Sequence, residues 1–91
     1  MIDIEQTIAQ RTSNYGDFKE IARIAQNIKR AMVGSPNWAD LPDDMRETLE
    51  MIAHKIGRIL NGDPKYADSW HDIIGYARLI ERQLGGGDVV I

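Results

Sequence analysis

The stretch HKIGRILNGDPKYADSWHDIIGYARL, residues 54–79, decides the fold, because it joins two helix-like patterns through a very short turn. Asn61 and Gly62 end the first pattern, and Pro64 follows where a helix could not continue without distortion. A turn this short makes the second helix return antiparallel to the first. We therefore expect an antiparallel helical hairpin.

Helical periodicity extends this hairpin in both directions. The third helix of the chain is expected from Asp43 or Asp44 to Leu60, and the fourth from about Asp68 to Leu84. Apolar residues recur on each of them at the spacing that marks one buried face. The expected inward faces are Met45, Leu49, Ile52, Ile56, Ile59 and Leu60 on the third helix, and Trp70, Ile73, Ala77, Ile80 and Leu84 on the fourth.

Two further helical segments precede the hairpin. The second helix is expected from Asp17 to Val33, with Asp17 as the N-cap and Glu20 completing a capping box. A first helix of one or two turns is expected near Ile4 to Arg11, broken afterwards by short polar residues and a glycine. The expected apolar face of the second helix is Phe18, Ile21, Ile24, Ala25, Ile28 and Met32.

The predicted fold class is therefore all-α, a bundle of three main helices with a short N-terminal helix. Residues 1–84 form one domain, and residues 85–91 are a glycine-rich stop with a short apolar tail. The tail either stays unstructured or docks on a neighbour. A chain of 91 residues has a limited core, so a homo-oligomer is expected.

Composition excludes several classes of protein. The net charge of −3 and the scattered basic residues argue against a binder of duplex nucleic acid. The absence of cysteine removes disulfides, thiolate metal sites and cysteine nucleophiles. No apolar run approaches the roughly 18 residues of a membrane span, and no signal-peptide pattern stands at the N-terminus. A cytoplasmic protein without membrane partners is expected.

The hairpin brings opposite charges together. Lys55 and Arg58, near the end of one helix, should lie close to Asp68 and Asp72, near the start of the other. One interpretation is a set of solvated ion pairs, each contributing about 0–1 kcal/mol. The other is a ligand site, in which acids hold Mg²⁺ and the two cations hold phosphate. Gly75, in mid-helix beside Asp72, suggests the close approach of another helix or a ligand.

A second candidate site precedes the second helix, in the stretch RTSNYGDF (11–18). Tyr15 either packs on nearby apolar groups and staples the helix start, or it stacks on a base with Arg11 near its phosphate. The histidines His54 and His71 stand alone on their helices, which does not favour a transition-metal site.

Three motifs carry a resemblance to a known family. They are R-x-x-x-Y-G-D-F (11–18), K-I-x-R-I (55–59) and D-S-W-x-D-I-x-G-Y-A (68–77), in that order. Together they resemble a family of small phage and prophage proteins of unknown function, which is similar to the nucleotide-modification-associated domains of phages. The resemblance implies a phage-type protein, acting in the host cytoplasm.

A more distant similarity is to the MazG-like all-α nucleoside triphosphate pyrophosphatases, which hold Mg²⁺ on an E-x-x-E and an E-x-x-D pair. Glu47 and Glu50 match the first pair. In the second, Ser69 stands where an acid is expected, Asp72 is kept, and Asp68 lies one residue earlier. The resemblance implies a nucleotide ligand more strongly than it implies hydrolysis.

The leading hypothesis is a protein that binds a nucleotide or a nucleotide-derived phosphate ligand, with Mg²⁺-dependent pyrophosphatase-like activity left open. No catalytic residue is assigned. The alternatives are a counter-defence protein that sequesters a host signalling nucleotide or blocks a host protein, and a structural oligomerisation module. The candidate ligand-binding residues are Tyr15, Lys55, Arg58, Asp68, Trp70 and Asp72, and the candidate Mg²⁺ ligands are Glu50, Asp68 and Asp72.

Overall fold

The computed structural model describes residues 3–85, and all of its regular structure in that range is helical. Four α-helices follow one another: α1 (Ile4–Tyr15), α2 (Phe18–Val33), α3 (Asp43–Asn61) and α4 (Ala67–Gln83), with a short 3₁₀ helix at Trp38–Asp40 before α3. The all-α prediction is confirmed. The predicted tail beyond Gly85 lies outside the described residues.

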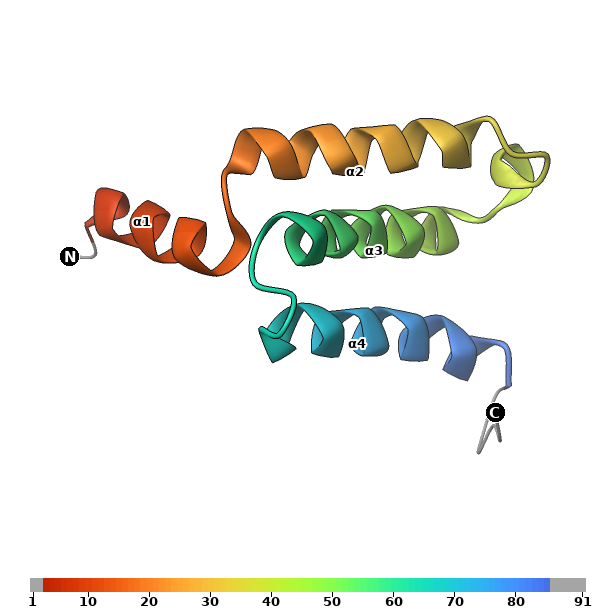
Figure 1. Ribbon diagram of the computed structural model, residues 1–91. Helices are drawn as coiled ribbons and strands as arrows, with labels where there is room; N and C mark the ends of the chain where they lie inside the picture. The colour runs from red at the N-terminus through yellow and green to blue at the C-terminus, as the bar shows by residue number, and fades with distance from the viewer. Residues whose placement is uncertain (1–2, 86–91) are drawn as a thin grey trace.

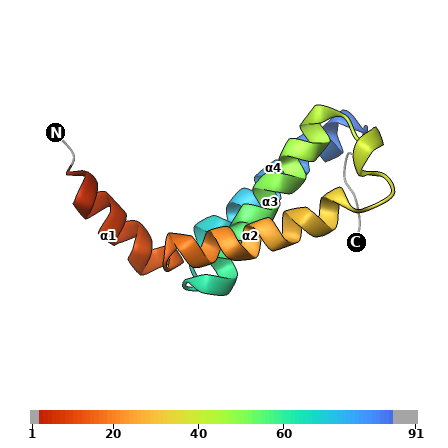
Figure 2. The same ribbon diagram turned by 90° about the horizontal axis from the view of Figure 1, so that it is seen from above.

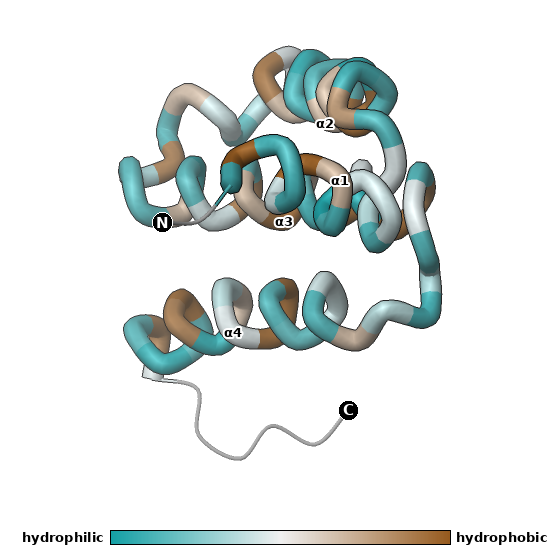
Figure 3. Tube along the Cα trace, turned by 90° about the vertical axis from the view of Figure 1, so that its left-hand side faces the viewer, coloured by the Kyte–Doolittle hydropathy of each residue, from teal (hydrophilic) through white to brown (hydrophobic). Residues whose placement is uncertain are grey.

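The three long helices lie side by side, with α3 in the middle, α2 along one side and α4 along the other (Figure 1). The view turned by 90° about the vertical axis shows the same order, with α2 above α3 and α4 below it (Figure 3). The short α3–α4 connection makes these two helices antiparallel, as expected. The radius of gyration is 15.3 Å, against about 12 Å for a compact domain of this length. The arrangement is therefore more open than a closed bundle.

The α2–α3 contact holds the most deeply buried apolar side chains of the described residues. Ile21 and Ala25 of α2 are buried, and so are Ala53 and Gly57 of α3. Gly57 lets the two backbones come close, because a Cβ at this position would lie only 3.0 Å from the carbonyl oxygen of Ile21. The absence of a side chain at Gly57 therefore sets how closely α2 and α3 pack.

The first helix is longer than the sequence predicts. Thr12 and Ser13 do not break α1, because their hydroxyls donate to the carbonyls of Ile8 and Gln10 and stay within the helix. The helix ends instead at Gly16, whose φ of 84° is a conformation that side-chain-bearing residues rarely adopt. No residue of α1 is fully buried, and the helix extends away from the other three (Figure 2).

Several residues predicted to face inward are instead exposed. Trp70 is 52% exposed, and the buried residue in the first turn of α4 is the neighbouring Ser69. Ser69 is buried in place of Trp70 because it lies on the side of α4 that meets α3, and helical periodicity alone does not determine that side. The other predicted core residues that the structure leaves exposed are Phe18, Leu49, Leu60, Ala77 and Leu84.

Two smaller predictions are also corrected. Asp17 does occupy the N-cap position of α2, but its side chain makes no capping hydrogen bond, and Glu20 pairs with Arg23 one turn on instead of completing a capping box. Gly75 has no heavy atom within 4 Å of where its Cβ would be, so no helix approaches it closely. The close helix approach occurs at Gly57.

Candidate ligand-binding site

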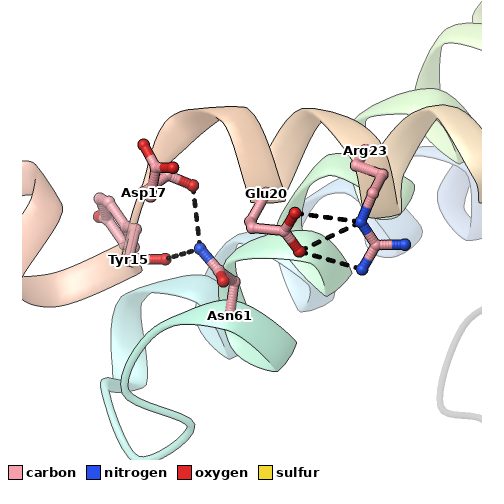
Figure 4. Close-up of polar contacts among 5 residues, drawn as sticks. All are labelled: Tyr15, Asp17, Glu20, Arg23 and Asn61. Atoms are coloured by element: carbon pink, nitrogen blue, oxygen red, sulfur yellow. Dashed lines mark hydrogen bonds and ion pairs between the residues drawn. The ribbon is translucent and has the colours of Figure 1, made fainter.

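The end of α3 is fastened to the junction between α1 and α2 by one amide side chain. Nδ2 of Asn61 donates to the backbone carbonyls of Tyr15, at 3.3 Å, and Asp17, at 3.0 Å (Figure 4). The backbone nitrogen of Asp63 donates to the carbonyl of Asn14 at 3.0 Å. The bonds to Asn14 and Tyr15 satisfy carbonyls without intrahelical partners at the end of α1, whereas the Asp17 carbonyl also accepts from the backbone nitrogens of Glu20 and Ile21 at the start of α2.

A side chain on Gly62 would collide with the backbone of Tyr15, so this junction needs a glycine in the turn. The sequence marks Asn61 and Gly62 only as a helix stop. Their second role, the attachment of α1 to the hairpin, depends on contacts between residues more than forty positions apart.

Three side chains stack beside this junction. The guanidinium carbon of Arg58 lies 4.2 Å from the centre of the Tyr15 ring, which is a cation–π contact. The ring of Tyr66 is 5.6 Å from the Tyr15 ring, tilted by 59°. The Nε of Arg58 is buried and has no hydrogen-bond partner among the described residues. The Arg58 guanidinium thus lies against the Tyr15 ring, and its Nε–H donates to none of the described residues.

This cluster opens into a pocket of about 230 Å³. Two arginines, Arg11 and Arg58, and two aromatic residues, Tyr15 and Phe18, contribute to its wall. The remaining lining residues are Ile8, Thr12, Gly16 and Ile21. Neither arginine forms an ion pair within residues 3–85. The pocket therefore combines an apolar wall with two arginines that form no ion pair within the described residues.

The predicted contact across the hairpin does form, between Lys55 and Asp72. Nζ of Lys55 lies 2.9 Å from a carboxylate oxygen of Asp72. Lys55 is only 8% exposed, whereas the Asp72 side chain is about half exposed. The hydrogen bond from Lys55 lowers the pKa of Asp72. The pair places the charge of a buried lysine against a carboxylate that water also reaches.

Asp68 is linked to the aromatic cluster. Its hydrogen bond with the Tyr66 hydroxyl, together with its negative charge, raises the pKa of that phenol. Since Tyr66 also contacts Tyr15, Asp68 lies at the edge of the same cluster of rings. Asp68 forms no ion pair with Lys55 or Arg58 within the described residues.

His54 is partly buried on the polar side of α3. Burial lowers the pKa of this imidazole, and the positive charges of Arg58, Lys55 and Lys29 lower it further. Burial and the neighbouring cations therefore favour the neutral form of the His54 imidazole.

Residues 2–84 match a protein family described as a domain of unknown function, DUF6378. The chain belongs to this family. The match spans all four helices of this chain and includes both Tyr15 and Arg58. No curated protein and no solved structure matches the chain. Within residues 3–85, no helix has the length and apolar character needed to cross a membrane.

In this DUF6378 chain, the structure brings some of the predicted site residues together and separates others. Tyr15 meets Arg58, Lys55 meets Asp72, and Asp68 reaches Tyr15 only through Tyr66. These contacts join the three sequence motifs, which lie far apart along the chain, at one end of the helical layer.

Trp70 is directed elsewhere. Its indole Nε1 donates to the carbonyl of Pro64 at 2.8 Å, which ties the first turn of α4 to the preceding loop. The predicted Mg²⁺ ligands Glu50, Asp68 and Asp72 do not form a cluster, since residues 3–85 contain no group of three or more acids or histidines that could hold a metal ion.

Sequence reasoning missed three participants: Tyr66, Phe18 and Asn61. Phe18 was assigned to the core by its helical spacing, but it is exposed and lines the pocket. Tyr66 precedes the helical pattern of α4, where an aromatic residue carries no periodic signal. The useful signal lay in the first motif, which places Arg11, Tyr15 and Phe18 within eight residues of one another.

Proposed function

We propose that the protein binds a nucleotide or a nucleotide-derived phosphate ligand in the pocket at the α1–α2 junction. The observation that carries the proposal is that Arg11, Tyr15 and Arg58 share one pocket, although Arg58 is more than forty residues from the other two. An arginine fork suits phosphate oxygens, and an aromatic ring suits the face of a base. The arrangement supports an anionic, partly aromatic ligand.

The roles of the side chains follow from their partners. Arg11 and Arg58 form no ion pair within the described residues, so they are available to phosphate, whereas Lys55 already pairs with Asp72. Tyr15 and Phe18 supply the aromatic surface for a base. The volume of about 230 Å³ is below the 300 Å³ or more of typical small-molecule sites. We therefore expect the pocket to enclose one part of a nucleotide and leave the rest in solvent.

The proposal is for binding, without hydrolysis. Metal-assisted attack of water on a triphosphate uses carboxylates that hold Mg²⁺ beside the phosphates, and within residues 3–85 Glu50, Asp68 and Asp72 do not gather in one group. The likeness to small phage proteins and to MazG-like enzymes rests on sequence motifs, and it supports a nucleotide ligand. It also supports action in a host cytoplasm, where the ligand would be a signalling nucleotide that the protein sequesters.

The experiment is a binding titration with a panel of nucleotides, cyclic dinucleotides and inorganic phosphate, read by thermal shift and calorimetry. A ligand at a hundred times its dissociation constant stabilises the folded state by about 2.7 kcal/mol, which is readily seen as a rise in Tm. Intact nucleotide should be recovered after heat denaturation. Release of pyrophosphate from a triphosphate would instead show that the protein hydrolyses its ligand.

Matched arginine variants locate the site. Arg11→Gln removes one pocket cation from an exposed position, and we expect affinity to fall about tenfold or more, as for a lost charged hydrogen bond. The control is Arg23→Gln, which removes an exposed arginine that pairs with Glu20 outside the pocket. Equal losses in the two variants would mean that only net charge matters. No thermal shift with any ligand would refute the proposal.

The alternative is a protein that blocks a host protein. The observation in its favour is the amount of exposed apolar surface, which includes Ile4 and Ile8 on the projecting α1. That alternative predicts a stable protein complex and no nucleotide effect on Tm.

A further inference from the structure

The first helix, α1, gains little stability from packing on the rest of the chain. None of its residues is buried, and its two isoleucines, Ile4 and Ile8, are 65% and 50% exposed. Within residues 3–85, the hydrogen bonds that residues 4–13 make stay inside α1 and its N-cap. The helix projects from the layer formed by the other three (Figure 2). Most of α1 is therefore held mainly by its own backbone hydrogen bonds.

A helix of this length and composition is not stable by itself in water. α1 has 12 residues, and isolated helices shorter than about 12–15 residues are marginal even when they are rich in alanine. It also contains Thr7, Thr12, Ser13 and Asn14, which are residues of low helix propensity. The helical structure of α1 therefore depends on the place where it is attached to the other helices.

The polar and stacking contacts that attach α1 gather at its last two residues. The carbonyl of Tyr15 accepts a hydrogen bond from Asn61 at 3.3 Å, and the Tyr15 ring lies 4.2 Å from the guanidinium carbon of Arg58. The carbonyl of Asn14 accepts from the backbone nitrogen of Asp63 at 3.0 Å. All three donors belong to the end of α3 and the turn that follows it. Because these contacts lie at one end of α1, their loss releases the whole helix.

The same helix forms half of the candidate pocket. Four of the eight lining residues belong to α1, namely Ile8, Arg11, Thr12 and Tyr15. A chain in which α1 is unfolded keeps Arg58 on α3 but holds neither Arg11 nor Tyr15 opposite it. The pocket therefore exists only while α1 is folded and attached.

We propose that α1 is an order–disorder element, which unfolds as one unit while α2, α3 and α4 stay folded, and whose folding assembles the pocket. The start of α2 does not need α1, because the Asp17 carbonyl accepts from the backbone nitrogens of Glu20 and Ile21 within α2 itself. Ordering of a segment is an established way of switching a site. Stabilisation of folded α1 by a ligand rests on the proposed function, whereas its unfolding in the free protein does not.

The test is native-state hydrogen exchange of the full chain without ligand, followed by NMR at low urea concentrations. The amides of residues 8–15 should exchange with one common free energy, at a rate roughly tenfold or more above that of the buried Ala53 in α3. Their exchange should depend weakly on urea, because unfolding of α1 exposes little surface. Exchange of residues 8–15 only together with Ala53, or a gradual increase toward the N-terminus without a common value, would overturn the proposal.

Gly75→Ala separates local from global unfolding. A Cβ at position 75 meets open space, so alanine stabilises α4 whether or not α1 is folded. Exchange at Ala53 should slow about two- to fivefold in this variant, with no change at residues 8–15. Equal slowing at both would mean that α1 unfolds only with the whole chain, against the proposal.

Asn61→Ala tests the attachment itself. It removes the side-chain hydrogen bonds to Tyr15 and Asp17, and exchange of residues 8–15 should become about tenfold faster. Unchanged exchange of these residues would show that this attachment does not control α1.

AMP, which carries one base and one phosphate, is the probe for coupling to a ligand. If AMP binds only when α1 is folded, it should slow exchange at residues 8–15 and at Ala53 by the same factor. A rise in Tm with AMP and no change at residues 8–15 would overturn the coupling. If neither AMP nor any other nucleotide binds, the proposed function fails, while exchange in the free protein still decides whether α1 unfolds as a unit.

Discussion

Two mid-helix glycines should respond in opposite directions to the same substitution. Gly57 lies where α3 meets α2, and an added Cβ would be 3.0 Å from the Ile21 carbonyl oxygen and 3.3 Å from its Cγ2. Gly75 has open space where its Cβ would be. Replacing a helical glycine by alanine ordinarily stabilises a helix by about 1 kcal/mol. We expect Gly75→Ala to gain about 0.5–1 kcal/mol in this way.

At Gly57 the same gain is outweighed by overpacking. The nearest atom is a backbone oxygen within α2, which cannot rotate away as a side chain would, so the two helices must separate. Overpacking of this kind costs about 1–3 kcal/mol, which leaves Gly57→Ala about 1 kcal/mol less stable than wild type. The two variants should then differ by about 2 kcal/mol.

The assay is urea denaturation of both variants beside wild type, with Tm from circular dichroism. For a chain of this length, a difference of about 2 kcal/mol corresponds to roughly 8–16 °C in Tm. If Gly57→Ala were as stable as Gly75→Ala, the close approach of α2 to α3 at this position would be refuted. If Gly75→Ala were the less stable variant, Gly75 would have a packing partner that the single chain does not contain.

Three further perturbations test the site and its electrostatics. Asn61→Ala removes both side-chain hydrogen bonds to the α1–α2 junction and should cost about 1–2 kcal/mol in urea denaturation, with faster amide exchange in α1. Asp72→Asn should reduce the fall in the free energy of unfolding at acid pH. Lys55 lowers the pKa of Asp72 in the folded state, so the Asp72 carboxylate stabilises the fold above its ordinary pKa of 3.8. That stabilisation is lost as the pH falls through the lower pKa of the folded state. The free energy of unfolding is measured by urea denaturation at each pH, and the same pH dependence in Asp72→Asn as in wild type would contradict the ion pair. His54→Gln should remove a loss of stability on acidification that begins near the ordinary pKa of 6.5, because the unfolded state binds the proton more readily; His71→Gln, at an exposed position, is the control and should keep that loss.

The helices themselves could be predicted from the sequence, because each depends on the spacing of its own apolar residues and on the glycine, proline and polar residues at its ends. The hairpin between α3 and α4 follows from a short turn that contains a glycine and a proline, and its antiparallel order is confirmed. The pairing of Lys55 with Asp72 also followed, since register along a tight hairpin is nearly determined by its turn.

Contacts between distant segments could not be predicted in the same way. Periodicity shows that a helix has an apolar face, but not which part of that face meets a neighbour and which part stays exposed. Trp70 was therefore expected inside, whereas the structure buries Ser69. Gly75 was expected at a close approach, whereas that approach is at Gly57.

The candidate pocket shows the same division. The sequence by itself determined that Arg11 and Tyr15 stand together at a helix end, since they are local neighbours. Only the tertiary structure decided that Arg58 completes the pocket with them, because Asn61 ties the end of α3 to the α1–α2 junction. That link depends on backbone carbonyls at the α1–α2 junction, and the sequence does not mark them because every residue has a backbone carbonyl.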